Sequence, residues 1–579
     1  MFKDFKKYFE LFYKYSKGYK FRILVAIIFG IVANLSLLAF PIVTRFLIDI
    51  VIIQRYYGFF KFALLAIIII FFIFFVTSLL ANYQFFESFG RINIKLQTDI
   101  FKNAQSAPIS FYENTSPGEI SYRILTDTYV VGKSWMDYLA TIPLQLIFLV
   151  AIIFMFQWHK ELTLFAFLIL FLQSLIVVKF RKPLLQYSYS IKEKQQQVLG
   201  YTTEHFSKIQ LIRSLNMEKR EQNKFFDKLF ELFKTSLQGF MVNKFSSTLS
   251  MAVNNLWAFG ILWYGGLQAI KGNISLGTLM AFLMFVNLLS NPIIILTEAV
   301  LSFQDVRASL RRVLAYYEEI NPKVCEYEEY KKENIEISDN KIVIKNCSFS
   351  YNEKLILKKI NLVIPSNSIF ALVGPSGAGK STLCKLLVRF YEPQVGEIFI
   401  GDKKIQDIPV SLLRRQVLLV LQNQYVYNGT ILENITCGAE NFNEKEVLIA
   451  AKKAAIDFID ELPYKLHTKV GIDGINLSVG QAQRIALARA FYLSPKIFIL
   501  DEPTAFIDCE TEEKIISSLL LLKQQSTVII IAHRLSTVKI ADKVAVMFNG
   551  EIKEIGEPNE LIKNPDSMFS RMYRLFLGK

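Results

Sequence analysis

The sequence predicts a polytopic α-helical membrane domain with six spanning helices, followed by a soluble α/β domain. Three observations lead to this fold class. Long apolar stretches all lie before residue 301. After residue 340, short β-type runs alternate with helical patterns, which is typical of an α/β sheet. The chain of 579 residues is also too long for one hydrophobic core, so at least two domains are expected.

The membrane domain is predicted from stretches of apolar residues. A bilayer core about 30 Å thick needs roughly 20 apolar residues in a helix. Six stretches are long enough: 23–48, 59–82, 137–158, 161–180, 247–270 and 275–300. The polar segments 83–135 and 181–245 carry Ile, Leu and Phe at helical spacing, so we expect them to extend the membrane helices.

Four parts of the chain follow from this pattern. Residues 1–20 alternate Phe, Tyr and Leu with Lys, which predicts an amphipathic helix lying at the membrane interface. Residues 21–317 form the predicted transmembrane domain with its two long polar loops. Residues 318–340 are rich in Glu, Lys, Asn and Tyr and are expected to be a linker, and residues 341–579 form the α/β domain.

The distribution of positive charge predicts the orientation in the membrane. The formal net charge is +15, and Lys and Arg crowd the N-terminus and the segments 83–135 and 181–245. The short alternate loops carry Arg55, Lys160 and Lys271. An excess of Lys and Arg marks cytoplasmic loops, so a multi-pass protein of the cell membrane is expected, with both termini and the α/β domain in the cytoplasm. The sequence lacks the pattern of basic and aromatic residues that is typical of a nucleic-acid-binding groove, so no nucleic-acid partner is expected.

The cysteines and the start of the chain agree with this assignment. All five cysteines lie after residue 324 and lack the paired spacing of a metal site, which predicts reduced cytosolic thiols. Some twenty charged and aromatic residues precede the first apolar stretch, and no small-residue cleavage site ends that stretch. A cleavable signal peptide is therefore not expected.

A glycine-rich motif predicts a phosphate-binding loop. Residues 374–382 fit the pattern G-x-x-x-x-G-K-[ST] and lie between an apolar strand-like run and a helical pattern. In such a loop, backbone N–H groups and the helix N-terminus surround phosphate oxygens. Lys380 is expected to reach the β- and γ-phosphates of ATP, and Ser381 to hold Mg²⁺. The predicted nucleotide contacts are Gly374, Pro375, Ser376, Gly377, Ala378, Gly379, Lys380, Ser381 and Thr382.

Two acidic residues follow the next buried run of the α/β domain. The apolar stretch Ile497 to Leu500 ends in Asp501 and Glu502. Ligands bind at the carboxyl ends of parallel strands, so Asp501 is predicted to bind Mg²⁺ and Glu502 to polarise the attacking water. Two acids after a strand more often cap a helix, but the phosphate loop favours the catalytic interpretation.

A third motif connects the other two to a known family. Residues 477–481 read Leu-Ser-Val-Gly-Gln and are followed by Gln483-Arg484 and then by the Asp-Glu strand. This combination resembles the ATP-binding cassette (ABC) family, and specifically its exporter-type half-transporters for drugs, lipids or peptides. The resemblance covers essentially the whole chain. It implies that two cassettes meet head to tail, with each ATP between the phosphate loop of one and Ser478, Gly480 and Gln481 of the other.

The same resemblance implies further functional positions. Tyr351 matches the aromatic residue that stacks on adenine, Gln422 the glutamine that contacts Mg²⁺ and the attacking water, and His533 the histidine that contacts the γ-phosphate. Asp508 is expected in the loop that crosses the dimer interface. Any single Tyr, Gln or His is usually structural, so these assignments rest on order and spacing. Segments 107–120 and 204–218 resemble the two cytoplasmic coupling elements of exporters.

Two positions depart from the family pattern. Val479 replaces a glycine of the signature, and a β-branched side chain adds bulk where the backbone approaches the nucleotide. Ile472 stands where a glutamate is common. A heterodimer in which this altered signature serves a weak ATP site of the partner fits these departures. A homodimer that tolerates the valine fits as well and is favoured by base rates.

The expected function is ATP-driven export or lipid flipping by a dimeric transporter in the lipid bilayer. Charged residues in the predicted spans are few; Arg45 and Asp49 are four apart and can neutralise each other, and Glu298 lies near one end. A hydrophobic or amphipathic small molecule, lipid or peptide is therefore the favoured substrate. The alternatives are an ATP-gated channel or regulator, or an importer, on the same scaffold.

Overall fold

The computed structural model describes residues 2–576 except 116, 320–338, 352–353, 423 and 472–473. Most of the predicted linker and the position of Ile472 therefore lie outside the described residues. The chain divides into two compact units: residues 1–104 with 116–319, and residues 105–115 with 320–579.

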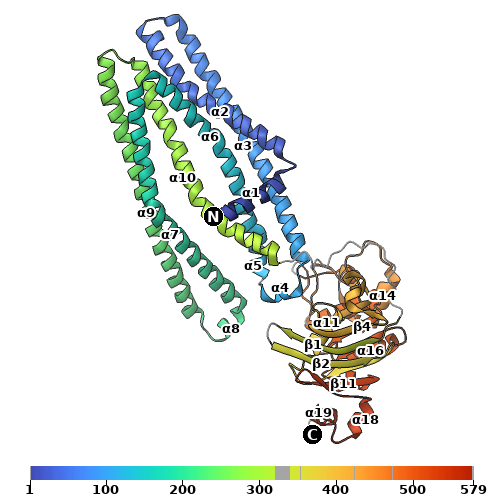
Figure 1. Cartoon of the computed structure of the whole chain (residues 1–579). Coiled ribbons are helices and arrows are strands. Elements are labelled where there is room, and N and C mark those ends of the chain that lie inside the picture. The colour runs from blue at the N-terminus through green and yellow to red at the C-terminus, as the bar shows by residue number, and fades with distance from the viewer. Residues whose placement is uncertain are drawn as a thin grey trace. The chain divides into compact units, whose positions relative to one another are not determined.

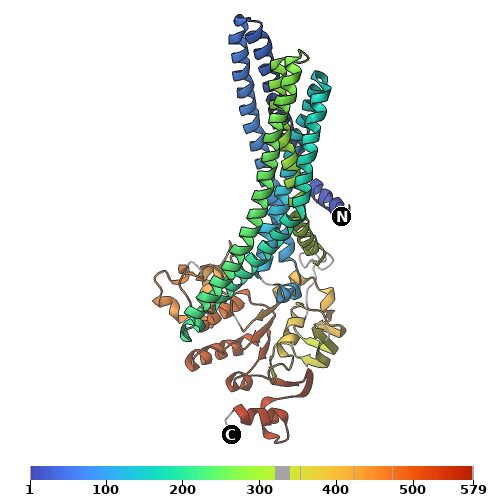
Figure 2. The same cartoon turned by 90° about the vertical axis from the view of Figure 1, so that its left-hand side faces the viewer.

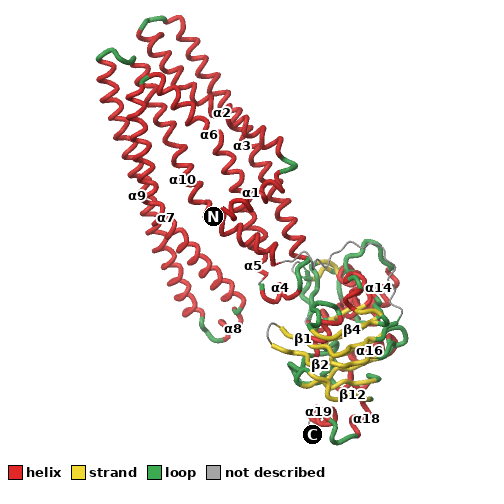
Figure 3. Tube along the Cα trace, in the orientation of Figure 1, coloured by secondary structure: helices red, strands yellow, loops and turns green. Residues whose placement is uncertain are grey.

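The first unit is entirely helical in its described residues. Figure 1 and Figure 2 show long helices, of which α7 and α9 run side by side, and Figure 3 shows the same elements by type. The elements are α1 (Phe2–Ser16), α2 (Lys20–Phe46), the π-helix η1 (Leu47–Ile53), the short 3-10 helix η2 (Tyr57–Phe59), α3 (Phe60–Gln105), α5 (Pro117–Tyr122), the π-helix η3 (Arg123–Asp127), α6 (Thr128–Trp158), α7 (Lys160–Ser207), α8 (Ile209–Ser214), α9 (Glu218–Ile270) and α10 (Leu276–Glu319).

Several of these helices are built to cross a membrane. Within the described residues, three segments are long and apolar enough: Lys20–Ile53, Tyr57–Gln105 and Pro117–Trp158. The apolar window of the second segment is only 6% buried, so its Phe and Ile side chains face outward, as lipid-facing residues do. The predicted total of six spans remains a prediction. The expected helical extension into the polar segments is observed in α3, which continues to Gln105, and in α7 and α9, which are each unbroken. That α7 and α9 cross the membrane remains a prediction.

A buried apolar cluster joins the helices of the first unit. Phe282 and Phe285 of α10 pack with Ile147 of α6, Leu162 of α7 and Ile261 of α9, all with at most 3% of their surface exposed. Between helices in a bilayer, such contacts stabilise through van der Waals packing, because lipid tails are as apolar as these side chains. The helices therefore hold one another through their own side chains.

A polar cluster secures the ends of α2 and α10. The Gly277 N–H donates to Asp49 Oδ1 at 2.8 Å, and the Ser275 hydroxyl donates to the same carboxylate. Arg45 Nε lies 3.7 Å from Asp49 Oδ2, which confirms the pair predicted from sequence. The Arg45 guanidinium also stacks on the Trp158 ring at 4.4 Å.

Among its described residues, the second unit contains three sheets. The six-stranded sheet has the order β12-β11-β3-β10-β9-β6, with β12 antiparallel and the other neighbours parallel. A four-stranded antiparallel sheet has the order β2-β1-β4-β5, and β7 pairs with β8. The strands are β1 (Ile342–Tyr351), β2 (Lys354–Ile364), β3 (Ile369–Val373), β4 (Val395–Ile400), β5 (Lys403–Lys404), β6 (Val417–Val420), β7 (Gly429–Thr430), β8 (Lys469–Val470), β9 (Ile497–Asp501), β10 (Thr527–Ile531), β11 (Lys543–Phe548) and β12 (Glu551–Gly556).

Short helices complete this unit and cover its sheets. They are α4 (Ile109–Asn114), α11 (Lys380–Leu387), the 3-10 helix η5 (Ile405–Asp407), α12 (Val410–Gln416), α13 (Ile431–Thr436), α14 (Glu444–Lys453), the 3-10 helices η6 (Asp457–Glu461) and η7 (Lys465–His467), α15 (Val479–Leu493), α16 (Cys509–Leu522), α17 (Leu535–Lys539), α18 (Pro558–Lys563) and α19 (Met568–Phe576).

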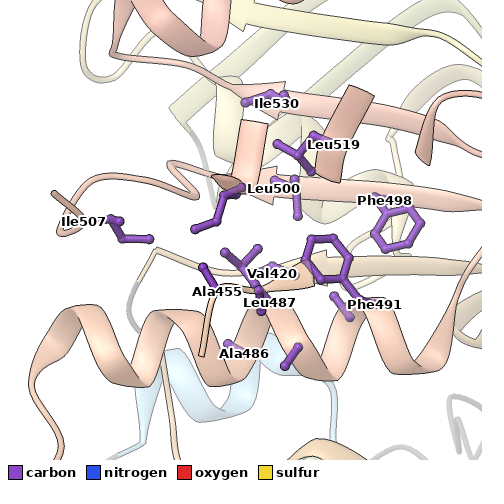
Figure 4. Packing of buried hydrophobic residues seen from close by; sticks show 14 of the residues in the cluster. Val420, Ala455, Ala486, Leu487, Phe491, Phe498, Leu500, Ile507, Leu519 and Ile530 are labelled. Carbon is purple, nitrogen blue, oxygen red and sulfur yellow. The ribbon is translucent and has the colours of Figure 1, made fainter. Parts of the chain in front are cut away.

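The central strands separate two hydrophobic cores. Successive side chains of a strand point to opposite faces, so Phe498 and Leu500 of β9 enter the core shared with α15, and Ile497 and Ile499 enter the core shared with the four-stranded sheet. Figure 4 shows Phe498 and Leu500 pointing toward α15, with Phe498 beside Phe491. The two cores fix the strands from both sides, and the strand ends therefore present their side chains at defined positions.

Candidate functional site

Four parallel strands bring the predicted site residues to one edge of the six-stranded sheet. The phosphate loop follows β3, Gln422 follows β6, Asp501 and Glu502 end β9, and His533 follows β10. These residues line one cavity of about 590 Å³, together with Lys354, Asn549 and Gly550. This volume lies within the range of small-molecule sites. The fold therefore assembles, in one place, residues that are up to 196 positions apart, from Lys354 to Gly550.

The backbone of the loop requires glycine. Gly374 has φ 151°, and a Cβ there would lie 2.1 Å from the Met547 carbonyl oxygen. Gly379 has φ 99° and comes directly before α11, so that the N–H groups of the first turn of α11 face the loop. A side chain at either position is sterically excluded. The loop and helix N-terminus form an anion-binding cradle.

Lys380 supplies the positive charge of this cradle. Its side chain is buried, and Nζ donates to the carbonyl oxygens of Gly374 at 2.8 Å and Pro375 at 3.0 Å. Burial lowers the pKa of Lys380, whereas the nearby carboxylates of Asp501 and Glu502 act in the opposite direction. The ammonium group is thus held inside the loop at the place where phosphate oxygens would bind.

Asp501 and Ser381 form a pair of oxygen donors beside the loop. Their side chains are hydrogen-bonded to each other. Burial raises the pKa of Asp501, with a further contribution from Glu502, and the hydrogen bond from Ser381 opposes this shift. A carboxylate and a hydroxyl are the ligands that Mg²⁺ prefers, so the donor set fits that ion.

Glu502 is held between two other predicted residues. Gln422 Nε2 donates to Glu502 Oε2 at 2.8 Å, and His533 Nε2 lies 3.2 Å from Glu502 Oε1. Of the three residues that the sequence predicts to be catalytic, Gln422 and His533 therefore each lie within hydrogen-bonding distance of Glu502. This arrangement places a carboxylate, an amide and an imidazole at the mouth of the phosphate cradle.

The remaining predicted residues lie elsewhere on the unit. Ser478 and Gln481 cap the start of α15: the Gln481 N–H donates to Ser478 Oγ at 3.1 Å, and the Ser478 N–H donates to Gln481 Oε1 at 2.9 Å. Neither they nor Gly480 line the cavity. Tyr351 is also outside the lining, but it pairs with Lys354, which is part of it.

Some residues of the site were not expected from the sequence. Gln483 is fully buried, and its Nε2 donates to the Glu502 carbonyl oxygen at 2.8 Å. Lys354 and Asn549 line the cavity. The sequence offered one signal for Asn549, because Asn-Gly marks a turn with positive φ, and Asn549 has φ 50°. Lys354 lies on a surface strand with other lysines and offered none.

Comparison with known proteins agrees with this geometry. Residues 23–293 match the family model for the ABC transporter transmembrane region, and residues 357–505 match the ABC transporter model. The chain is 34% identical to an "ATP-dependent lipid A-core flippase" from Desulfotalea psychrophila, over 80% of this chain and 81% of that protein. The chain belongs to the ABC transporter family.

Further comparisons place this ABC transporter among exporters. It is 32% identical to a "Multidrug resistance ABC transporter ATP-binding and permease protein" from Lactococcus lactis, over 82% of this chain and 80% of that one. The solved structure of a bacterial Atm1-family ABC exporter with ATP bound has a TM-score of 0.81 and 24% identity, covering 96% of this chain and 98% of that one. This likeness shows the exporter fold.

The predictions of family, fold class and enzyme class are therefore confirmed. The chain is an exporter-type ABC transporter, a multi-pass membrane protein whose ATP-binding domain hydrolyses ATP to drive export or flipping.

Proposed function

We propose that this transporter moves an amphipathic, lipid-like molecule out of the inner leaflet of the cell membrane, using ATP hydrolysis at the cavity described above. The observation that carries the proposal is the position of Glu502, whose carboxylate is held by Gln422 and His533 next to the Asp501 and Ser381 pair. A site that only bound ATP to gate a channel would have no need of an oriented carboxylate at this point.

The phosphate loop binds and orients the nucleotide in this proposal. Backbone N–H groups from Ser376 to Thr382 surround the phosphates, and Lys380 moves from the loop carbonyls onto the β- and γ-phosphate oxygens. Ser381, Asp501 and Gln422 would hold Mg²⁺, which, when bound, neutralises charge that develops on the phosphates.

Glu502 acts on the attacking water. Its carboxylate accepts a proton from the water as the water approaches the γ-phosphate. Gln422 orients the carboxylate and the water, and His533 donates to a γ-phosphate oxygen from its place beside Glu502. Preorganised donors and acceptors of this kind supply much of the stabilisation of the transition state.

A second cassette completes the site. Ser478, Gly480 and Gln481 lie at the start of α15 and do not line the cavity of their own chain, which supports a head-to-tail dimer in which they contact the ATP of the partner. A homodimer is favoured because most oligomers are symmetric. A heterodimer in which Val479 marks a weak site is the other assembly.

The cargo is assigned to the amphipathic class. Relatives of this chain include a lipid A-core flippase and a multidrug resistance transporter. Arg45 and Asp49, two charged residues of the first membrane helix, neutralise each other, so they offer no path for small ions. Both termini and the cassette face the cytoplasm in this proposal, because the cationic loops do.

Uptake into inside-out membrane vesicles tests the proposal. Vesicles containing the transporter should accumulate a fluorescent amphipathic lipid when MgATP is added outside, and vesicles with Glu502→Gln should not. Depletion of preloaded lipid would indicate import. An ATP-dependent ion current without movement of lipid would indicate a channel or regulator, and either result would contradict the proposal.

A further inference from the structure

A side-chain cluster links α4 to the predicted base-binding tyrosine within the second unit. Residues 105–115 belong to this unit, and Glu113 near the end of α4 contacts two side chains that are far away in sequence. Glu113 Oε1 accepts from Lys385 Nζ at 2.8 Å, and Oε2 accepts from the Tyr391 hydroxyl. Both oxygens of the Glu113 carboxylate thereby accept hydrogen bonds from side chains of the α/β domain.

The two donors meet again at Tyr351. The Tyr391 ring packs edge-on against the Tyr351 ring, with centroids 5.1 Å apart and an interplanar angle of 88°. The Lys385 ammonium lies 6.0 Å from the centroids of both rings and is also hydrogen-bonded to the Tyr351 hydroxyl. A change at Glu113 therefore reaches Tyr351 by two routes.

The cluster is tied to the nucleotide cavity from two sides. Lys385 belongs to α11, the helix that begins at the phosphate loop with Lys380. Tyr351 pairs across the β1–β2 hairpin with Lys354, which lines the cavity. Phe349 packs edge-on against Tyr351, with centroids 4.9 Å apart, and so supports the ring from a third direction.

Electrostatics hold the carboxylate in its charged form. Burial alone would raise the pKa of Glu113, but the hydrogen bonds from Lys385 and Tyr391 bring it below its usual value. Burial likewise lowers the pKa of Lys385, and its bonds to Glu113 and Tyr351 more than offset that effect. A partly exposed ion pair contributes little to stability by itself.

We propose that Glu113 is a positioning residue for the nucleotide base: through Lys385 and Tyr391 it holds the ring of Tyr351, so that base binding and the docking of α4 favour each other. Linkage requires the effect to be reciprocal. This inference rests on the proposed function only in taking ATP as the ligand and Tyr351 as its stacking partner.

The test compares a ligand that has a base with one that lacks it. The full chain in lipid nanodiscs, in a Glu502→Gln background that prevents consumption of ATP, is titrated calorimetrically with MgATP and with magnesium tripolyphosphate. Glu113→Gln and Tyr391→Phe should each weaken ATP binding by about fivefold or more and leave tripolyphosphate binding unchanged. Glu119→Gln, which breaks a 2.8 Å ion pair with Arg123 outside the cluster, is the matched control and should change neither.

The same titrations in a chain that also carries Tyr351→Leu show whether Glu113→Gln weakens ATP binding through Tyr351. Tyr351→Leu should itself weaken ATP binding, and Glu113→Gln should add no further loss in that background. An equal loss for both ligands, an undiminished loss in the Tyr351→Leu background, or unchanged ATP affinity would each overturn the proposal.

Amide hydrogen exchange provides an independent measurement on a chain in which Glu113, Lys385, Tyr391 and Tyr351 are unaltered. Exchange of residues 105–115 should slow on addition of ATP but not of tripolyphosphate, and the same response to both or to neither would contradict the proposal. Absence of lipid uptake would count against the proposed function alone, because these binding measurements do not depend on transport.

Discussion

Glu502 is in a backbone conformation that residues with a side chain rarely adopt. Its φ is 53°, which costs about 1–3 kcal/mol. Both backbone groups are held: its N–H donates to the Ile531 carbonyl oxygen at 3.1 Å, and its own carbonyl accepts from Gln483 at 2.8 Å. This conformation directs the carboxylate toward Gln422 and His533, so the cost is offset by a site whose geometry is set before ATP binds.

Val479 is the residue at which the signature departs from the family pattern. Its side chain is 58% exposed at the first position of α15, beside Gly480. If its methyl groups crowd the ATP of the partner, Val479→Gly should raise the steady-state rate of ATP hydrolysis at least about twofold. Val479→Ala, which removes the branch without freeing the backbone, should give an intermediate rate. An unchanged rate in both variants of the assembled dimer would show that the valine is harmless.

Residues that follow the parallel strands could be predicted from the sequence. The phosphate loop, Asp501 and Glu502 follow recognisable apolar runs, and the edge of the sheet brings them together. The contact of Glu113 with Lys385 joins residues 272 positions apart and depends on where a short helix docks. No local pattern carries that information, so this contact could not be predicted. The role of Gln483 likewise depends on the path of the chain after Glu502.

The buried strands could be predicted from the sequence. The same is true of the long helices that continue beyond their apolar parts. The runs at 497–500 and 527–531 are strands because continuous apolar stretches fit a sheet covered on both faces. Strand β2 was not predicted: seven of its eleven residues are apolar, but Lys354, Lys358 and Lys359 interrupt the apolar run. Its position at the edge of the four-stranded sheet leaves these lysines in solvent.

The segment η3 is tied to α10 by an ion pair whose loss we expect to be measurable. Arg312 donates to both oxygens of Asp127 at 2.7 Å, and Asp127 is only 1% exposed. Arg312→Gln leaves a buried carboxylate without its cation. Because Arg312 is 43% exposed, we expect a loss of about 1–3 kcal/mol, seen as a lower melting temperature in detergent.

The double variant is the control for this prediction. Asp127→Asn combined with Arg312→Gln removes the charge together with its partner and should recover most of the stability lost in Arg312→Gln. If the double variant melts as low as Arg312→Gln alone, the cost lies in lost packing of Arg312 and not in the unpaired carboxylate.

We propose that one chain carries the two halves of an ATP site at separate places. The cavity holds the phosphate loop and Glu502, and the signature residues lie at the start of α15 outside it. Native mass measurement of the complex, solubilised from its own host, should therefore give twice the chain mass of 66.7 kDa and one polypeptide on denaturation. A second polypeptide of similar length would contradict the homodimer, and a monomer that hydrolyses ATP would contradict the shared site.

The central claim is that Glu502 performs the ATP hydrolysis that drives transport. Steady-state ATPase measurements on the purified chain in lipid, with and without Glu502→Gln, test it most directly. We predict Mg²⁺-dependent hydrolysis by the unaltered chain and a rate at least about 100-fold lower for Glu502→Gln, with ATP binding retained. Turnover by Glu502→Gln at the rate of the unaltered chain, or no hydrolysis by the unaltered dimer, would contradict the claim.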